Sequence, residues 1–511
     1  MPLLIVGLIS GLLSIFAFIY GKDFWVYILI FLSTLTIRLH FSSQENYLHN
    51  WDERYHALVA KNLTENPINP VLRKDAVLPY EYTEWWGNHV WLHKQPLFLW
   101  QIALSMKIFG VNEFAVRFPS AILCALLALI IYRIGILFKR KTAGFISSLL
   151  FCFSFFSIEL STGAIGMDHN DIAATFYISA SLWALIEYYK SKKVKWLILI
   201  GVFSGLAILV KWLVGLLVYA CWGLCLIIYE NKTTYLKELK GIVISLGITI
   251  LIFLPWQIYT FIQFPTEAIY EFNFNRQHIS RAVESHSGSN LFYLNNIFEH
   301  YGPLGIPMII LGLITLFISK LENKSKFLLV SIIVIPYLFF SLLSSTKTLG
   351  YVFYIAPYFI FVSTLCLDFL MKLINGKFGL SIERIALFVI TISISYFAFR
   401  YETLNNFHSN GISTYNWENK AAKEHNTEIY KSLDTYLKGE YIVLNCKGME
   451  DVEAMFYSNQ NVYNWWPKEN QIDSLKQEGY KIAAFTSHSN QILPDFILND
   501  PQIIIIDMEL Y

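Results

Sequence analysis

Charged residues are scarce in this sequence. Only 15% of the 511 residues are Asp, Glu, Lys or Arg, whereas 55% are apolar and 17% are aromatic. Soluble domains usually carry about 25% charged residues, so this balance excludes an ordinary soluble protein. The composition predicts a protein that crosses a membrane several times.

Other scarcities exclude further classes. The formal net charge is only +1, which argues against a general nucleic-acid binder. Neither a G-x-x-x-x-G-K-[ST] phosphate loop nor an H-E-x-x-H zinc motif is present. Of the six cysteines, only Cys446 lies outside an apolar run, so no extramembrane disulfide can form within one chain.

Long apolar runs, in contrast, are abundant. A run of about twenty apolar residues is long enough to cross the hydrocarbon core as a helix. The first run lacks the basic start and the A-x-A-like end of a cleaved signal peptide, and we expect it to be a retained span. Twelve candidate spans lie near 2–20, 24–40, 113–138, 143–160, 170–189, 196–210, 212–229, 241–258, 303–319, 327–345, 350–370 and 382–399.

The orientation follows from lysine and arginine, which accumulate in cytoplasmic loops. If the twelve spans alternate, the outer side holds residues 41–112, the link around Gly166 to Asp171, residues 259–302, the link around Lys347 and the tail from about 400. The basic loops then fall together on the predicted cytoplasmic side: Lys139-Arg140-Lys141, Lys190 to Lys195, Lys232 to Lys240, Lys320 to Lys326 and Lys372 to Lys377.

One more apolar run, Pro96 to Val111, is too short for a span and is interrupted by Lys107. If it crossed the membrane, every later basic loop would be placed outside. We therefore expect an amphipathic helix that lies in the interface, within a structured first outer loop.

The sequence becomes polar after Arg400. Short β-branched runs at 441–444, 481–486 and 503–508 alternate with helical stretches near 418–437, 450–458 and 468–478. This pattern predicts a small α/β domain with a largely parallel sheet. The predicted division is a membrane domain over 1–400, including the outer loop 41–112, and an extracytoplasmic domain over 401–511. Trp465-Trp466-Pro467 is either an aromatic sugar platform or part of the core of that domain.

Two carboxylates stand just beyond the second apolar run. Asp52 and Glu53 open a helical stretch over 54–63, on the outer side of the membrane. That position suits an enzyme that takes one substrate from the bilayer and another from water. The alternative is that both residues complement the helix dipole, because acidic side chains are favoured in a first turn.

Lysines on the outer side need a partner. Lys211 lies between two tightly linked spans and Lys347 between two others, although the charge rule disfavours both positions. An anionic lipid phosphate would be such a partner. Lys94 either joins it or extends its ammonium group to the interface. One residue of the group Asp168, His169, Asn170 and Asp171 is expected to cap the following span.

Several motifs, taken in order, resemble a known family. They are Trp51-Asp52-Glu53-Arg54-Tyr55-His56-Ala57, His93-Lys94-Gln95-Pro96-Leu97 and the run from Phe109 to Ser120. They resemble the start of glycosyltransferase family 39, a GT-C family that groups protein O-mannosyltransferase-like enzymes with the aminoarabinose transferase of lipid A. The resemblance continues through Asp168, Lys211 with Gly215, and Lys347 followed by Tyr354 and Pro357. Relatives commonly have Glu-Lys-Pro-Pro where this chain has His93-Lys94-Gln95-Pro96, so the resemblance does not name the sugar or the acceptor.

The resemblance implies a polytopic α-helical GT-C fold and an inverting sugar transfer. The donor would be a sugar on a polyprenyl monophosphate, whose leaving group needs little acid catalysis. Asp52 would deprotonate the acceptor hydroxyl, with Glu53 as the second catalytic candidate. Cations would hold the departing phosphate. The implied substrate-binding residues are Lys94, Asp168, Lys211, Lys347 and Tyr354.

The sequence identifies no cofactor, and a divalent metal stays open. The outer-side histidines could bind a divalent metal together with Glu81 or Glu84, but none has tight ligand spacing. Solvated surface histidines are the alternative interpretation. The histidines concerned are His93, His278, His286 and His300.

Taken as a whole, the sequence predicts a glycosyltransferase in the bacterial cytoplasmic (inner) membrane, with its active site and tail facing the periplasm or exterior. Its partners would be the lipid-linked donor, membrane lipid and an unnamed acceptor that is a protein, a lipid A-like glycolipid or a glycan. The Lys-, Asn- and Ile-rich composition indicates an AT-rich bacterial genome and favours undecaprenyl over dolichyl phosphate. The alternative is a transporter or flippase of a lipid-linked precursor, which would place charges at the midplane. Arg133, Glu159 and Glu187 lie instead toward span ends.

Overall fold

Two compact units make up the chain in the computed structural model, which describes all residues except 165–169, 412–418 and 487–491. The helical unit comprises Met1–Ser42, Lys94–Phe98 and Phe118–Asn405. The mixed unit comprises Ser43–His93, Leu99–Arg117 and Asn406–Tyr511. The first outer loop, predicted as part of the membrane domain, belongs for the most part to one compact unit with the tail.

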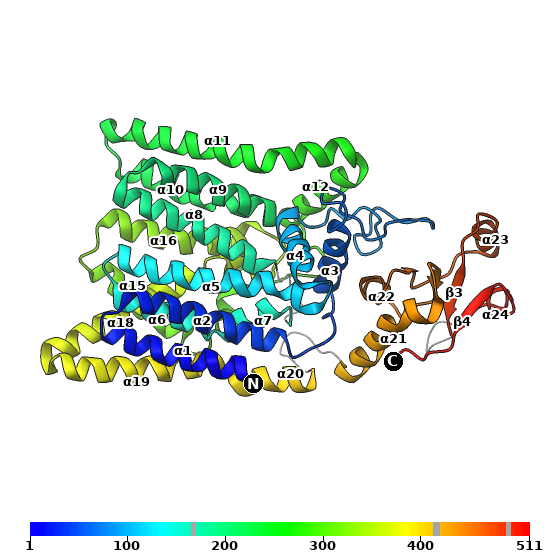
Figure 1. The fold of residues 1–511 in the computed structure, drawn as a ribbon. Helices are drawn as coiled ribbons and strands as arrows, with labels where there is room; N and C mark the ends of the chain where they lie inside the picture. Colours follow the sequence, from blue (N-terminus) through cyan, green and yellow to red (C-terminus); the bar gives the residue numbers. More distant parts are fainter. Residues whose placement is uncertain (165–169, 412–418, 487–491) are drawn as a thin grey trace. The chain divides into compact units, whose positions relative to one another are not determined.

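Apolar helices form the helical unit, and its long helices run in roughly the same direction (Figure 1). Two short non-α helices, η1 (Trp212–Leu216) and η2 (Phe339–Leu343), interrupt the series. The α-helices are α1 (Pro2–Ile19), α2 (Asp23–Ser42), α5 (Glu113–Leu137), α6 (Lys141–Cys152), α7 (Phe155–Thr162), α8 (Asp171–Ser191), α9 (Val194–Lys211), α10 (Leu217–Tyr229), α11 (Lys232–Gln263), α12 (Pro265–Ser280), α13 (Phe292–Asn295), α14 (Ile297–Tyr301), α15 (Gly305–Ile318), α16 (Asn323–Leu338), α17 (Gly350–Phe353), α18 (Ala356–Phe378) and α19 (Leu380–Phe399).

Each of the twelve predicted spans contains a helix. Within the described residues, eight helical segments are long and apolar enough to cross a membrane, or nine if the bent pair α6 and α7 counts as one span. One of the eight, Val194–Tyr229, contains α9, η1 and α10 and therefore covers two of the predicted spans. The prediction of a multi-pass membrane protein is thus confirmed.

The chain folds back on itself between α9 and α10. Ser204 Oγ donates a 2.7 Å hydrogen bond to the carbonyl of Gly215 in η1. A Cβ atom on Gly215 would lie 2.8 Å from Ile208 Cγ1, so only glycine allows this close return. The reversal leaves Lys211 at the end of α9, where the sequence predicted a link between two spans.

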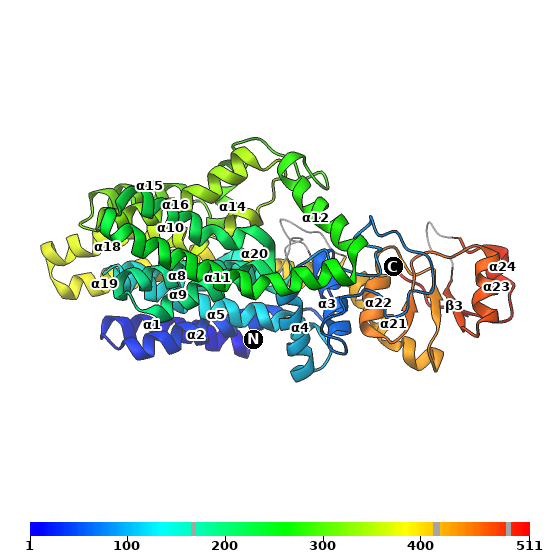
Figure 2. The same ribbon diagram turned by 90° about the horizontal axis from the view of Figure 1, so that it is seen from above.

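Small residues let the long helices approach closely. Figure 2 shows α11 lying over α9, and a Cβ atom on Gly201 of α9 would meet the Ser245 carbonyl of α11 at 2.4 Å. Between α5 and α6, Gly135 and Gly144 face each other in the same way. Helices in membranes commonly pack through small residues, because the bilayer offers no hydrophobic drive for their association.

Helices and a small sheet build the mixed unit. Its first part carries α3 (Asp52–Leu63) and most of α4 (Pro96–Phe109), a 14-residue helix at the position of the predicted interfacial helix. The chain enters its second part within α20 (Tyr401–Asn410). The tail elements are α21 (Lys420–Leu437), β1 (Ile442–Leu444), α22 (Asp451–Tyr457), β2 (Asn461–Val462), α23 (Glu469–Gln477), β3 (Ile482–Phe485), α24 (Asp495–Leu498) and β4 (Ile503–Ile506).

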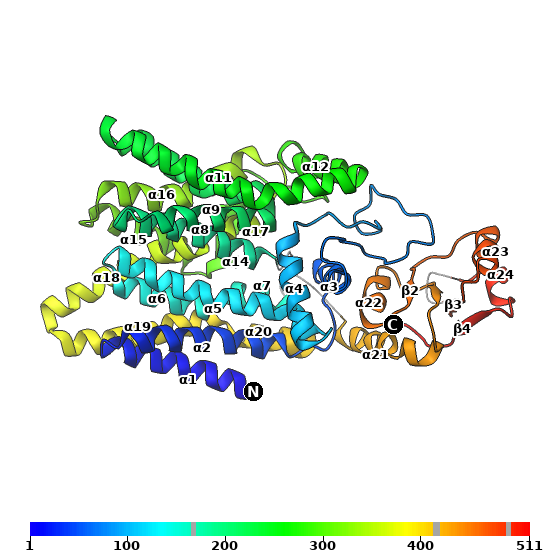
Figure 3. The same cartoon turned by 45° about the horizontal axis from the view of Figure 1, so that its top comes forward.

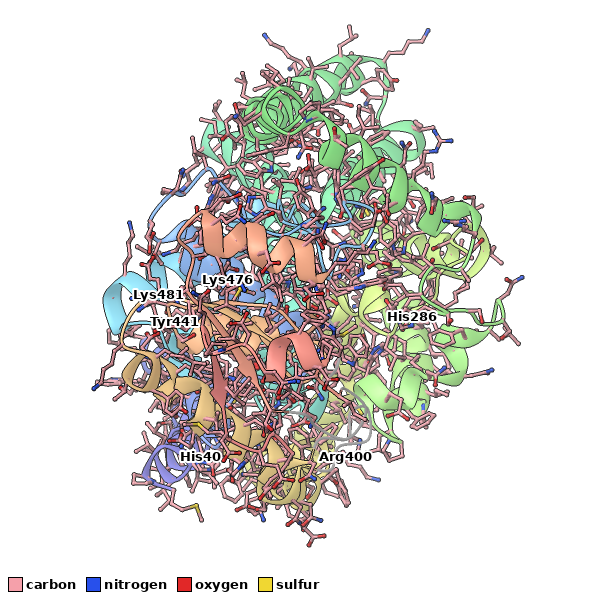
Figure 4. The ribbon with its side chains drawn as sticks, turned by 90° about the vertical axis from the view of Figure 1, so that its right-hand side faces the viewer. His40, His286, Arg400, Tyr441, Lys476 and Lys481 are labelled. Atoms are coloured by element: carbon pink, nitrogen blue, oxygen red, sulfur yellow. The ribbon has the colours of Figure 1, made fainter. Side chains whose placement is uncertain are left out.

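The tail sheet has the order β2-β1-β3-β4, and all its pairings are parallel. The prediction of an α/β region with a largely parallel sheet is confirmed, although β2, with only two residues, was missed. At the rim of this sheet, Lys481 lies over the ring of Tyr441, with its nitrogen 5.6 Å from the ring centroid (Figure 4).

The core of the tail includes a residue from the first outer loop. Leu78, only 4% exposed, packs with β-strand residues such as Ile442 and Ile482. Trp466 packs against the same cluster, whereas Trp465 is 37% exposed. The predicted aromatic pair is thus divided between the core and the surface.

Candidate functional site

A strained turn precedes Asp52 at the start of α3. The residue before it, Trp51, has φ 65° and ψ −124°, a left-handed backbone that bulky side chains rarely adopt. Such a conformation costs about 1–3 kcal/mol and persists only where the surrounding structure imposes it. The Trp51 side chain is 48% exposed, and Asp52 is half-buried.

Both carboxylate oxygens of Glu53, the neighbour of Asp52, accept hydrogen bonds. Its Oε1 accepts from Arg117 Nε at 2.7 Å, and its Oε2 accepts from Arg117 Nη2 at 3.1 Å and from the His49 backbone N–H at 2.6 Å. Arg117 also donates to the carbonyls of Glu45 and Tyr47. The bidentate pair therefore ties α3 and the loop at 45–49 to the start of α5. A catalytic role for Glu53 remains a prediction.

A second buried pair holds the same loop. His408 Nδ1 lies 2.5 Å from Glu45 Oε1. Burial raises the pKa of Glu45, but the charge of His408 and its hydrogen bond outweigh burial, so the net pKa is lower than usual. A carboxylate with a depressed pKa contributes stability above its unfolded-state pKa and loses it as the pH falls through the folded value. The loop next to Asp52 is therefore held at neutral pH and loosened by acid.

Aromatic rings surround the remaining face of α3. Tyr55 packs edge-on against Trp85 at 5.0 Å, and Trp85 stacks on His93 at 4.5 Å. Trp91 contacts both Tyr55 and His93. Burial raises the pKa of the Tyr55 hydroxyl above its ordinary value. His93, a predicted metal candidate, therefore packs inside an aromatic cluster.

A polar cluster in the helical unit brings together two of the predicted residues. The Lys211 ammonium at the end of α9 forms an ion pair with Asp171, the first residue of α8, and lies 5.6 Å from the Tyr354 ring centroid. The Tyr354 hydroxyl donates to Asp171 Oδ1 at 3.1 Å. Gly350 opens α17, next to α8 (Figure 3), and leaves room for the Asp171 carboxylate. The cluster comprises Asp171, Lys211, Gly350, Tyr351 and Tyr354.

Asp171 was not predicted as a site residue. The sequence predicted Asp171 only as a possible helix cap, and the family resemblance pointed to Asp168. Asp168 lies outside the described residues. The available signal was that Asp171 shares a short polar stretch with Asp168 and, like Lys211, stands at the end of a predicted span.

Lys347 contacts backbone carbonyls, which are not the contacts expected of a lysine that binds a phosphate. Its ammonium donates to the carbonyls of Ser341 at 2.9 Å and Ser344 at 2.6 Å, and also to that of Phe340. Only 4% of the residue is exposed, and burial lowers the pKa of the amine. These three carbonyls belong to η2 and the residue after it, so the lysine caps this helix end. Its predicted role in donor binding remains a prediction.

Lys94 lies immediately before α4 and is half-buried. The next residue, Gln95, accepts a 2.7 Å hydrogen bond from Gln257 of α11, and both glutamines belong to the helical unit. The chain at Lys94 is therefore anchored through its neighbour.

The predicted metal candidates form no cluster in the described structure. No group of three or more His, Cys, Asp or Glu side chains that could hold a metal ion occurs among the described residues. His300 packs between Phe156 and Phe353, and burial lowers its pKa to about 3. His278 lies 3.2 Å from the Tyr351 hydroxyl. A metal site remains a prediction.

Comparison with known sequences gives partial matches. The family model for dolichyl-phosphate-mannose-protein mannosyltransferase matches residues 93–259. The undecaprenyl phosphate-alpha-4-amino-4-deoxy-L-arabinose arabinosyl transferase of Photorhabdus laumondii is 25% identical over 257 residues, 48% of this chain and 44% of that protein. An uncharacterized protein of Aquifex aeolicus is 33% identical over 132 residues, 25% of each chain. The chain thus spans less than half the length of these relatives.

Solved structures match over most of the chain. ArnT from Cupriavidus metallidurans, solved bound to undecaprenyl phosphate, has a TM-score of 0.61 at 12% identity and covers 94% of this chain and 89% of its own. The oligosaccharyltransferase of Archaeoglobus fulgidus has a TM-score of 0.53 at 14% identity and covers 85% of this chain and 62% of its own. At these identities the likeness establishes a shared fold.

The shared fold defines a class, the polytopic helical membrane proteins with a small α/β region, and confirms the predicted fold class. The family model that matches residues 93–259 and the named arabinosyl transferase relatives are those of glycosyltransferases.

Proposed function

We propose that this protein is an inverting glycosyltransferase that moves a sugar from a polyprenyl-phosphate donor to a hydroxyl or phosphate acceptor. The observation that carries the proposal is the cluster around Lys211, in which a cation at a helix end is paired with Asp171 and flanked by two tyrosines. A cation so placed is rarely tolerated near a membrane without a function. A lipid-linked phosphate is the anion that suits it.

Similar proteins support a polyprenyl phosphate as the carrier of the donor sugar. Seven of the curated relatives are named for undecaprenyl phosphate-linked aminoarabinose transfer, and the neighbour from Cupriavidus metallidurans is described as bound to undecaprenyl phosphate. In this chain Lys211 would hold the phosphate as a compact positive charge, with Lys94 as a second cation. Tyr354 would orient Asp171 and so keep Lys211 in place.

Asp52 has the role of general base in this proposal. The leaving group is a phosphate monoester, which departs as an anion and needs cations more than a proton. The carboxylate of Asp52 therefore acts on the acceptor, whose hydroxyl proton it takes as the new bond to the sugar forms. Glu53 supports this role by fixing α3 through Arg117.

The direct test is transfer in a purified system. The protein, reconstituted with a polyprenyl-phosphate donor carrying a radiolabelled sugar and an envelope extract as acceptor, should release free polyprenyl phosphate and label the acceptor. Movement of intact donor across the bilayer without cleavage would favour the transporter alternative and contradict the proposal.

Loss of the Lys211 charge should weaken donor binding. Lys211→Met keeps the apolar stem and removes one charge-assisted contact, worth about 1.5–3 kcal/mol, or roughly ten- to a hundredfold in affinity. Binding of a labelled polyprenyl phosphate to the detergent-solubilised protein measures this loss. Lys347→Met is the matched comparison, because its ammonium caps η2. We expect Lys347→Met to lower the melting temperature, and a parallel loss of affinity would place Lys347 in the donor site as well. Unchanged affinity in Lys211→Met would remove Lys211 from that site.

The basic loops also predict the orientation of the protein in a bacterial inner membrane, with the mixed unit in the periplasm or exterior. In a background without native cysteines, Asp75→Cys and Lys420→Cys should react with an impermeant thiol reagent in spheroplasts. Lys193→Cys, on the predicted cytoplasmic side, should stay unlabelled until the membrane is broken. The reverse pattern would invert the orientation and move the proposed chemistry to the cytoplasmic face.

A further inference from the structure

The far end of α3 is fastened to α22 of the tail. Lys61 Nζ donates to the backbone carbonyls of Met455 at 2.8 Å, Phe456 at 3.1 Å and Ser458 at 2.6 Å. The last carbonyls of a helix have no partner within it, and an ammonium group supplies three donors. Burial lowers the pKa of Lys61 to about 8, so the group still carries its charge at neutral pH. Lys61 therefore acts as a cap on α22 supplied from α3.

A buried carboxylate makes the second connection between α3 and α22. Glu453 of α22 is fully buried, and its Oε1 lies 3.3 Å from Arg54 Nη1 and 2.5 Å from Lys423 Nζ. A buried carboxylate that loses a cationic partner is strongly destabilised. The two helices are thus joined by a charged contact near the start of α3, whose loss would be strongly destabilising, and by the Lys61 contact near the end of α3.

Residues of the first outer loop fix the start of α22 as well. Arg73 Nη2 lies 2.6 Å from Asp451 Oδ2, donates to the Val462 carbonyl at 2.9 Å and lies over the ring of Tyr463. Asp451 is the first residue of α22 and Val462 is in β2. The short helix is consequently held at both ends by the loop that carries Asp52.

The backbone conformation of Trp51 indicates why the position of Asp52 depends on these contacts. The left-handed conformation of Trp51 is unfavourable for tryptophan. The backbone preferences of the residues around Asp52 therefore do not by themselves give Asp52 its position. Contacts of the residues that follow Asp52 impose its place: Glu53 pairs with Arg117, and Arg54 and Lys61 bind α22.

We propose that the tail domain is a positioning module for the reaction, and that α22 holds α3 so that the Asp52 carboxylate keeps its productive place. Lys61 and Arg54 are the positioning residues. The inference rests on the proposed role of Asp52 as the base. In this proposal the tail contributes to sugar transfer without binding a ligand itself.

The experiment compares three variants of the full-length protein in lipid nanodiscs. Lys61→Met removes the donors to α22, Lys61→Arg keeps a cation there, and Lys74→Met is the control because its ion pair with Glu65 is exposed. The measurements are kcat and donor KM for transfer, together with amide hydrogen exchange in the first turn of α3. We expect Lys61→Met to lower kcat by about tenfold or more, since small misplacements of a reacting group are costly. Donor KM should stay within about twofold, amide exchange at 52–55 should rise, and Lys61→Arg should restore both kcat and exchange.

Two results would overturn the inference. One is wild-type kcat and wild-type exchange in Lys61→Met. The other is a uniform rise in exchange across β1 to β4 that Lys61→Arg does not reverse, because it would make Lys61 a stabiliser of the whole unit. If the wild-type protein transfers no sugar, the proposed function fails by itself. The exchange of the first turn of α3 then still decides whether α22 holds this helix.

Discussion

Asp52→Asn should lower turnover by about 10²–10⁴, the usual contribution of a general base. Asparagine keeps the shape of the side chain but cannot take the proton of the acceptor. Donor binding should survive, because Lys94 and Lys211 are unchanged. The measurement is the transfer rate of the purified variant at saturating donor, beside its affinity for labelled polyprenyl phosphate.

The helix-dipole interpretation gives a different result for the same variant. If Asp52 only complements the dipole of α3, the substitution costs at most about 1 kcal/mol of local stability and leaves turnover near normal. Glu53→Gln is the comparison, because both oxygens of Glu53 are engaged by Arg117 and the His49 N–H. A larger loss of turnover per folded molecule in Glu53→Gln would transfer the role of base to Glu53.

Arg117→Met should destabilise the protein by about 3–5 kcal/mol, because it leaves the Glu53 carboxylate buried without its cation. Both side chains of this pair are at most 1% exposed, so water cannot replace the lost partner. At about 2–4 °C for each kcal/mol, the melting temperature should fall by roughly 6–20 °C. Thermal unfolding of the detergent-solubilised variant, followed by circular dichroism, measures the change.

The double variant Glu53→Met with Arg117→Met tests the cause. Replacing both partners removes the uncompensated charge, so part of the lost stability should return. The carbonyls of Glu45 and Tyr47 still lose their donor, so the recovery should be incomplete. A double variant no more stable than Arg117→Met alone would mean that the arginine acts through those carbonyls and not through Glu53.

Hydrophobic runs were sufficient to predict the helices, because a bilayer requires about twenty apolar residues per span whatever the neighbours are. The alternation of the tail was equally informative, and three of its four strands fall within the predicted runs. The joining of the first outer loop to the tail was not predictable. Leu78 lies in a polar stretch, and nothing local signals that it packs against Ile442.

The partners of the charged side chains could not be predicted from the sequence either. The charge rule marked Lys211 and Lys347 as residues that need partners, but it does not say which partners. One lysine pairs with Asp171 and the other caps a helix end, and the difference depends on how α8 and η2 meet the loops around them. Asp171 was missed for the same reason, since a carboxylate at a helix start has a local explanation that needs no distant lysine.

The pairing of Arg54 with Glu453 also has a consequence for biogenesis. The two residues are separated by 399 positions in the chain. At about 5–20 residues per second, a ribosome needs roughly 20–80 s to make the intervening chain. During that time the loop at 43–93 is already made, while Leu78 and the cationic side chains of this loop still lack the tail. Such delayed contacts slow folding, so the newly made loop should be the part of the protein most dependent on chaperones and most open to proteases.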